Sequence, residues 1–107
     1  MPQKPVWDRP EVRRALNEAA REEIQQLLTA RGLTHLGVLS RGRYLVLYSE
    51  EEDEKVARLR FGRIEQGRYA LDMTNHRGGW EPTPFTGSLA ELFRLVTEQF
   101  PWVLAEL

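Results

Sequence analysis

The amino-acid sequence predicts an α+β fold in which an N-terminal helix precedes a four- or five-stranded antiparallel meander and a C-terminal helix. Three observations predict it. Apolar residues recur at helical spacing over about 9–31, the period changes to that of short strands joined by glycine turns, and helical spacing returns after residue 88. With 107 residues, 41% of them hydrophobic, the chain fits a single domain that spans residues 1–107.

The first helix has start and stop signals in the sequence. Asp8 is a favourable N-cap, Pro10 suits a first turn whose N–H groups are unpaired anyway, and Glu11 lies three residues after Asp8. Gly32 is a typical C-terminal stop. We therefore expect a helix over about 9–31, with its apolar face formed by Val12, Leu16, Ala19, Ala20, Ile24, Leu27 and Leu28.

Four short strands are predicted in the middle of the chain, over 36–40, 43–49, 55–62 and 68–74. The pairs Arg41-Gly42 and Gln66-Gly67 fit tight hairpin turns, because glycine accepts a positive φ cheaply. A third turn over 76–79 leads to a short fifth strand at Trp80, where Pro82 and Pro84 are expected to end regular pairing. Such short connections favour antiparallel neighbours.

The last third of the chain returns to helical spacing. Ser88 and Glu91 form a Ser-x-x-Glu capping box, and Pro101 is expected to end the helix before a short terminal turn over 102–107. The apolar stripe consists of Leu89, Leu92, Phe93, Val96 and Phe100.

The second strand is apolar on both faces. Tyr44, Val46 and Tyr48 alternate with Leu45 and Leu47. Two helices on one side of the sheet cannot cover both sets, so either a helix packs on each face or the second face meets another chain. In the third strand the predicted buried set is Ala57, Leu59 and Phe61, with Arg58 and Arg60 on the solvent side.

Composition excludes several classes of function. The chain contains no cysteine, which removes disulfides, thiolate nucleophiles and cysteine-containing zinc sites. We expect no cofactor, metal or membrane span, and a cytoplasmic location, because no long apolar run and no secretory signal is present. The acidic run over 50–54 lacks the spaced ligands of a calcium loop and is interpreted as a solvated hairpin loop.

Basic residues cluster in and after the second hairpin, and the net charge of the chain is −1. Arg58, Arg60 and Arg68 are candidates for a patch that binds phosphate or carboxylate. The favoured interpretation is a solvated, charged sheet face that prevents aggregation. The full cluster consists of Lys55, Arg58, Arg60, Arg63, Arg68 and Arg77.

Two further features carry weaker functional hypotheses. His76, on a glycine-rich turn with Asp72 close in sequence, could act as an acid or base, but no nucleophile accompanies it at a recognisable spacing. Accordingly, no catalytic residue is predicted. The aromatic residues Trp80 and Phe85 are interpreted as a plug at the edge of the core rather than as a recognition surface.

The order of helix, antiparallel strands and helix resembles the double-stranded RNA-binding domain in outline. That family contacts phosphate through a lysine-rich start of its last helix, where this chain carries Ser88-Leu89-Ala90-Glu91. The resemblance therefore implies no RNA-binding activity for this chain.

The leading functional hypothesis is a small non-enzymatic protein-interaction module, predicted to be a homodimer. Its partner is then itself or another protein, and the predicted contact residues are Tyr44, Val46, Tyr48, Arg58, Arg60 and Arg68. One alternative is RNA or DNA binding through the Arg58, Arg60 and Arg68 face. The other is a small enzyme that uses His76.

Overall fold

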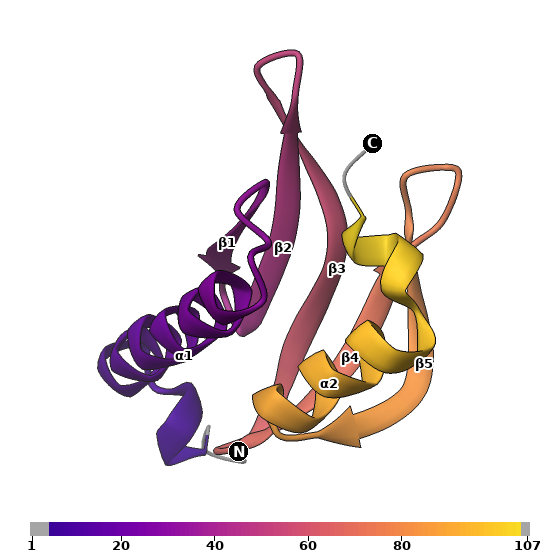
Figure 1. Ribbon diagram of the computed structural model, residues 1–107. Coiled ribbons are helices and arrows are strands. Elements are labelled where there is room, and N and C mark those ends of the chain that lie inside the picture. The colour runs from indigo at the N-terminus through magenta and orange to yellow at the C-terminus, as the bar shows by residue number, and fades with distance from the viewer. Residues whose placement is uncertain (1–4, 106–107) are drawn as a thin grey trace.

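The computed structural model describes residues 5–105, which form one five-stranded antiparallel sheet with two long helices, in the predicted order (Figure 1). The predicted α+β class and the meander topology are confirmed. The elements are η1 (Val6–Asp8), α1 (Pro10–Ala30), β1 (Leu36–Arg41), β2 (Tyr44–Glu51), β3 (Glu54–Glu65), β4 (Arg68–Thr74), β5 (Trp80–Gly87), α2 (Leu89–Gln99) and η2 (Pro101–Leu104). Of the terminal turn predicted over 102–107, residues 106 and 107 lie outside the described part.

The start of α1 differs from the prediction. Arg9, not Asp8, occupies the N-cap position and contributes no side-chain cap, while Pro10 is the first helical residue. Asp8 belongs to the short 3-10 turn η1, and its carboxylate lies 3.6 Å from the Arg13 guanidinium. The helix ends as expected, because Gly32 takes a φ of +69°.

The start of α2 confirms the predicted capping box. The Ser88 hydroxyl accepts a hydrogen bond from the backbone N–H of Glu91 at 3.1 Å, and the Glu91 carboxylate accepts one from the Ser88 N–H at 3.2 Å. The helix begins close to the end of β5, so this local signal also fixes where the chain leaves the sheet.

The strand boundaries follow the prediction with two differences. The first hairpin loop is Gly42 and Arg43, one residue later than expected, because Arg41 still pairs with Tyr44. The fifth strand continues through both prolines to Gly87, and Pro82 faces Asp72. Since β5 is an edge strand, a proline there can lack its N–H without breaking the ladder.

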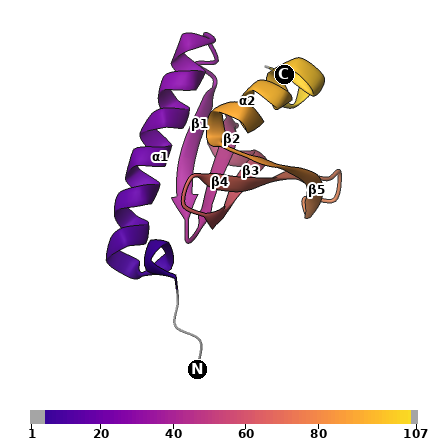
Figure 2. The same cartoon turned by 90° about the horizontal axis from the view of Figure 1, so that it is seen from below.

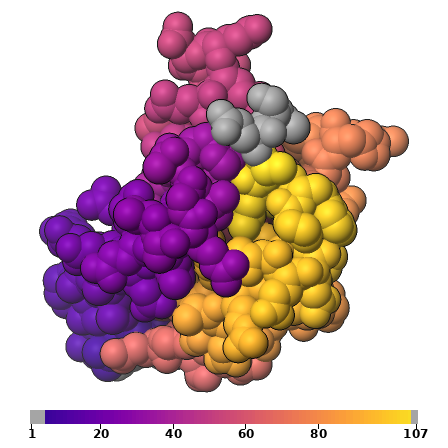
Figure 3. Space-filling model, viewed as in Figure 1, coloured from indigo at the N-terminus to yellow at the C-terminus, as the bar shows by residue number. Residues whose placement is uncertain are grey.

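Both helices pack on the same face of the sheet (Figures 1 and 2). Figure 3 shows this side of the molecule, with α1 and α2 next to each other over the sheet and the β2–β3 hairpin projecting beyond them. Because both helices lie on one side, a helix on each face is excluded for residues 5–105. The core under the helices contains Ile24, Leu28, Leu45, Leu47, Leu59, Phe61, Leu71, Leu92, Phe93 and Val96.

An irregularity in β3 changes which of its side chains face the helices. Leu47 pairs with Leu59, but the next residue, Tyr48, pairs with Ala57, so Arg58 is an extra residue in the ladder. The Arg58 guanidinium donates a hydrogen bond to the carbonyl of Val103 in η2, at 3.3 Å. The predicted alternation is therefore wrong at this point, because Arg58 turns toward the helix side and Ala57 toward the opposite side.

The backbone of the β2–β3 turn is strained at Glu52 and Asp53, and substitution can test this. Glu52 and Asp53 both have positive φ angles, 50° and 65°, in a two-residue hairpin loop of the kind that favours Asn-Gly. Replacing Glu52 by asparagine together with Asp53 by glycine should therefore raise the free energy of unfolding by about 1 kcal/mol. Urea denaturation followed by circular dichroism measures this change.

A charge-matched control separates the backbone effect from electrostatics. Glu52→Gln with Asp53→Gln removes the same two charges and keeps side chains at both positions. This Gln/Gln variant should raise the free energy of unfolding by less than the Asn/Gly variant does. Equal stabilisation by the two double variants would show that charge repulsion, and not the positive φ angles, is the cost at this turn.

Candidate functional site

The candidate site is the sheet surface opposite α1 and α2, which we call the open face. Within residues 5–105 no helix covers it, and a shallow hollow of about 290 Å³ lies on it. Apolar, aromatic and basic side chains line the hollow, and no carboxylate does. Its principal lining residues are Leu39, Arg41, Tyr44, Val46, Tyr48, Lys55, Ala57, Arg60 and Trp80.

Two glycines allow the tyrosine rings to lie close to the sheet. Gly37 in β1 pairs with Tyr48, and a Cβ atom at Gly37 would lie only 2.6 Å from the tyrosine ring. Gly62 in β3 pairs with Tyr44 in the same way, with a corresponding distance of 2.8 Å. Glycine inside a strand often marks such a close approach. The two rings are thus seated on neighbouring strands instead of extending freely into solvent.

Arg60 is held at the centre of the open face by three groups. Its guanidinium carbon lies 3.9 Å from the centre of the Tyr44 ring and 4.4 Å from that of Trp80, so the cation lies between two aromatic rings. Its Nε atom donates a hydrogen bond to the Asp72 carboxylate at 2.8 Å. The central positive charge is therefore neutralised within the protein.

The other cations on this face are less constrained. The Lys55 ammonium lies 4.9 Å from the centre of the Tyr48 ring, and Arg43 lies 5.4 Å from the centre of the Tyr44 ring. The pKa of Arg43 is raised above its ordinary value, chiefly by its hydrogen bond to the Tyr44 hydroxyl. No carboxylate of residues 5–105 lies within ion-pair distance of Arg41, Arg43 or Lys55. These cations remain available to a partner.

The structure brings together four of the six predicted contact residues. Tyr44, Val46, Tyr48 and Arg60 lie on the open face as expected. Arg58 does not, because the irregularity in β3 directs it toward Val103 and Glu51. Arg68 lies at the β3–β4 turn, away from the hollow, where it pairs with Glu65 at 3.8 Å and bonds Thr86. The candidate patch of Arg58, Arg60 and Arg68 is not formed.

Three residues of this face, Trp80, Gly37 and Gly62, have roles that the sequence did not predict. Trp80, which we expected to plug the core, lies against Arg60, and only Phe85 of that pair packs on the core. Gly37 and Gly62 were not recognised as seats for tyrosine rings. A glycine inside a strand was the available signal, but its meaning depends on the cross-strand register, which long-range pairing determines.

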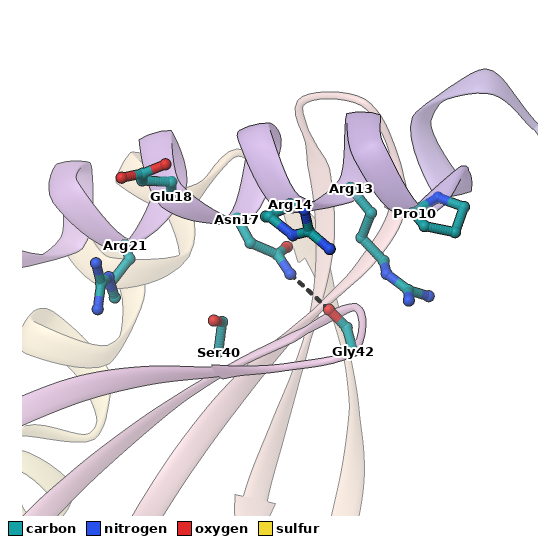
Figure 4. A pocket seen from close by; sticks show the side chains of 8 residues that line it. All are labelled: Pro10, Arg13, Arg14, Asn17, Glu18, Arg21, Ser40 and Gly42. Atoms are coloured by element: carbon teal, nitrogen blue, oxygen red, sulfur yellow. Dashed lines mark hydrogen bonds between the residues drawn. The ribbon is translucent and has the colours of Figure 1, made fainter.

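A second hollow, of about 370 Å³, lies between α1 and the β1–β2 turn (Figure 4). Arg13, Arg14 and Arg21 surround it, and Asn17 extends from the helix to donate a hydrogen bond to the Gly42 carbonyl at 2.7 Å. Asn17 thus fastens the turn to the helix. Glu18 lines the same hollow and Arg13 lies 3.6 Å from Asp8, so part of the positive charge of these arginines is balanced locally.

Other sequence features show no catalytic grouping in the described residues. His76 is exposed and makes no hydrogen bond there, and Asp72, its proposed partner, is engaged with Arg60. Within residues 5–105, no three His, Asp or Glu side chains are placed to hold a metal ion. Neither long helix of this part combines the length and apolar character needed to cross a membrane.

Comparison with known proteins adds no relative: no protein-family model, no curated protein and no solved structure matches this chain.

Proposed function

We propose that this protein is a non-enzymatic interaction module that binds a protein through the open face. The observation that carries the proposal is the construction of that face: tyrosine rings seated on strand glycines beside apolar side chains, with no covering helix in residues 5–105. Large apolar and aromatic surfaces left uncovered on a small domain are typical of interaction sites. Tyrosine, tryptophan and arginine are also the residues that most often anchor protein contacts.

The pairing of the arginines favours a protein partner over RNA or DNA. A polyanion binds through cations whose charge is free to neutralise phosphate. Here Arg60 is bound to Asp72, Arg58 lies 3.6 Å from Glu51, and Arg68 lies near Glu65. The three arginines on which the nucleic-acid hypothesis depended therefore each have an acidic neighbour.

Site-specific photo-cross-linking in cells tests the proposed function. A photoreactive amino acid at Ala57, on the open face, should give discrete protein adducts, whereas the same group at Gln25, on the exposed side of α1, should not. Adducts to nucleic acid instead of protein would support the alternative. Absence of any discrete adduct at Ala57 would contradict the proposal.

A substitution on the open face should lower the yield of the Ala57 cross-link by a measurable factor. Tyr48→Glu removes an aromatic ring from the hollow and introduces a charge there, and it should lower the yield of the Ala57 adduct about tenfold, the effect of roughly 1.4 kcal/mol of lost binding. Ile64→Glu, which also changes an exposed side chain at another site, is the matched control. Circular dichroism should show unchanged helix content in both. If Tyr48→Glu unfolds the protein, Tyr48 belongs to the core and Lys55→Glu replaces it as the probe.

A further inference from the structure

We propose that the partner on the open face is a second copy of this chain, packed face to face with its β2 antiparallel to that of the first. In this arrangement the acidic β2–β3 hairpin of each copy lies against the Arg41 and Arg43 end of the other. The inference rests on the proposed function, because it names the occupant of the same face. It is carried by the distribution of charge along β2.

The centre of the open face suits burial against an identical surface. Leu39, Val46 and Ala57 line the hollow, and Val46 is already only 8% exposed. The central cation, Arg60, has its counter-ion Asp72 in the same copy, at 2.8 Å. Burying a charge is costly when it lacks a partner. Two such centres can therefore meet without leaving an unpaired charge between them.

The two ends of β2 carry opposite charge. Arg41 and Arg43 flank its first residue, and five consecutive acidic residues, 50–54, form the hairpin at its other end. At about 3.3 Å per residue the ends of this strand are roughly 25 Å apart, well beyond the screening length of about 8 Å at physiological salt. The two groups therefore do not neutralise each other within one copy. Lys55, opposite Glu50, and Arg58, beside Glu51, offset two of the five acidic charges, so this end keeps a net charge of −3.

A two-fold axis that lies between the two faces, at right angles to β2, gives the charged groups at both ends of the strand an oppositely charged partner. It sets each acidic hairpin beside the basic end of the other copy, so the same contact forms twice. A parallel arrangement would instead place like charges together, which is unfavourable. A nucleic acid would be attracted to one end and repelled by the other. A second copy is thus complementary to the whole length of the face.

The shape of the hairpin is compatible with this contact. Figures 1 and 3 show that it projects beyond the helices and the rest of the sheet. Glu52, Asp53 and Glu54 at its tip are exposed, and in the described residues only Glu51 of the acidic run pairs with a basic side chain, Arg58 at 3.6 Å. The tip carboxylates are therefore available to a second molecule.

A charge-swap experiment by analytical ultracentrifugation tests the arrangement. One variant carries Glu50→Lys, Glu52→Lys and Asp53→Lys, which changes the charge of residues 50–54 from −5 to +1, and the other carries Arg41→Glu and Arg43→Glu. Each alone should weaken dimerisation at least about tenfold, because both symmetric contacts become repulsive. An equal mixture should form a heterodimer with nearly wild-type affinity, since both contacts are attractive again. Glu22→Lys with Glu23→Lys, on the exposed side of α1, is the control that leaves dimerisation unchanged.

The outcomes separate this inference from the proposed function. If the wild-type chain stays monomeric while Ala57 still cross-links to another protein, the dimer inference is wrong and the proposed interaction function is supported. A dimer that forms but is not restored by mixing the two variants overturns the antiparallel register. Species larger than a dimer would indicate a head-to-tail contact and likewise contradict the two-fold arrangement. Failure of both the cross-link and self-association removes the proposed function itself.

Discussion

Replacing Leu47 by alanine should lower the free energy of unfolding by about 2–5 kcal/mol, because the side chain is fully buried and its loss leaves a cavity. Leu47 lies in the middle of β2 and faces the helices, within the core that contains Ile24 and Leu59. Urea denaturation at a concentration where the chain is monomeric measures the change.

The neighbouring residue provides the control for this prediction. Val46 is adjacent in sequence but faces the open side, where no helix of residues 5–105 covers it. Because Val46 is only 8% exposed, Val46→Ala should cost about 1.6 kcal/mol in the monomer, the transfer of two methyl groups at roughly 0.8 kcal/mol each. Equal losses at the two positions would show that Val46 is packed as tightly as Leu47, although it lies outside the core under the helices.

Replacing Arg63 by methionine should raise the free energy of unfolding by about 1–4 kcal/mol. Arg63 is 1% exposed on the helix side of the sheet, and its Nη1 atom has no hydrogen-bond partner in the described residues. Its Nη2 atom donates one long hydrogen bond, 3.4 Å, to the Tyr69 hydroxyl, and the ring of Tyr69 lies 5.5 Å away. These contacts compensate only part of the cost of burying a guanidinium.

Arg63→Lys is a second test of whether the buried charge at this position lowers the free energy of unfolding. It keeps the buried charge but removes the contacts that the guanidinium makes, so it should lower the stability. Chemical denaturation of both variants, with Arg94→Met as a control at an exposed site, gives the comparison. A stability loss in Arg63→Met would show that the guanidinium has a compensating partner in solution, such as a bound anion.

The local elements were predictable because their signals are local. The capping box of Ser88 and Glu91 and the turn glycines Gly32 and Gly67 act within a few residues, and each appears in the structure as predicted. The N-cap of α1 was wrong because Asp8 is drawn into η1 and toward Arg13. A nearby cation thus competed with the cap for the same carboxylate.

The candidate site was only partly predictable. Alternation along β2 correctly separated Tyr44, Val46 and Tyr48 from the leucines, because the side-chain period of a strand does not depend on the rest of the fold. The same rule failed in β3, where one extra residue reversed the face of Arg58. Such an irregularity is decided by pairing with the neighbouring strand and leaves no clear mark in the sequence.

By itself, the sequence determined the type and order of the elements and the two-sided character of β2, since periodicity, caps and turns are properties of short segments. Only the tertiary structure decided that both helices pack on one face, that Arg63 is buried, and that Trp80 and Asp72 hold Arg60 on the other. The physical reason is that each of these facts depends on contacts between residues distant along the chain. The energies of these contacts depend on which surfaces of different elements pack against each other, and a single segment of sequence does not contain that information.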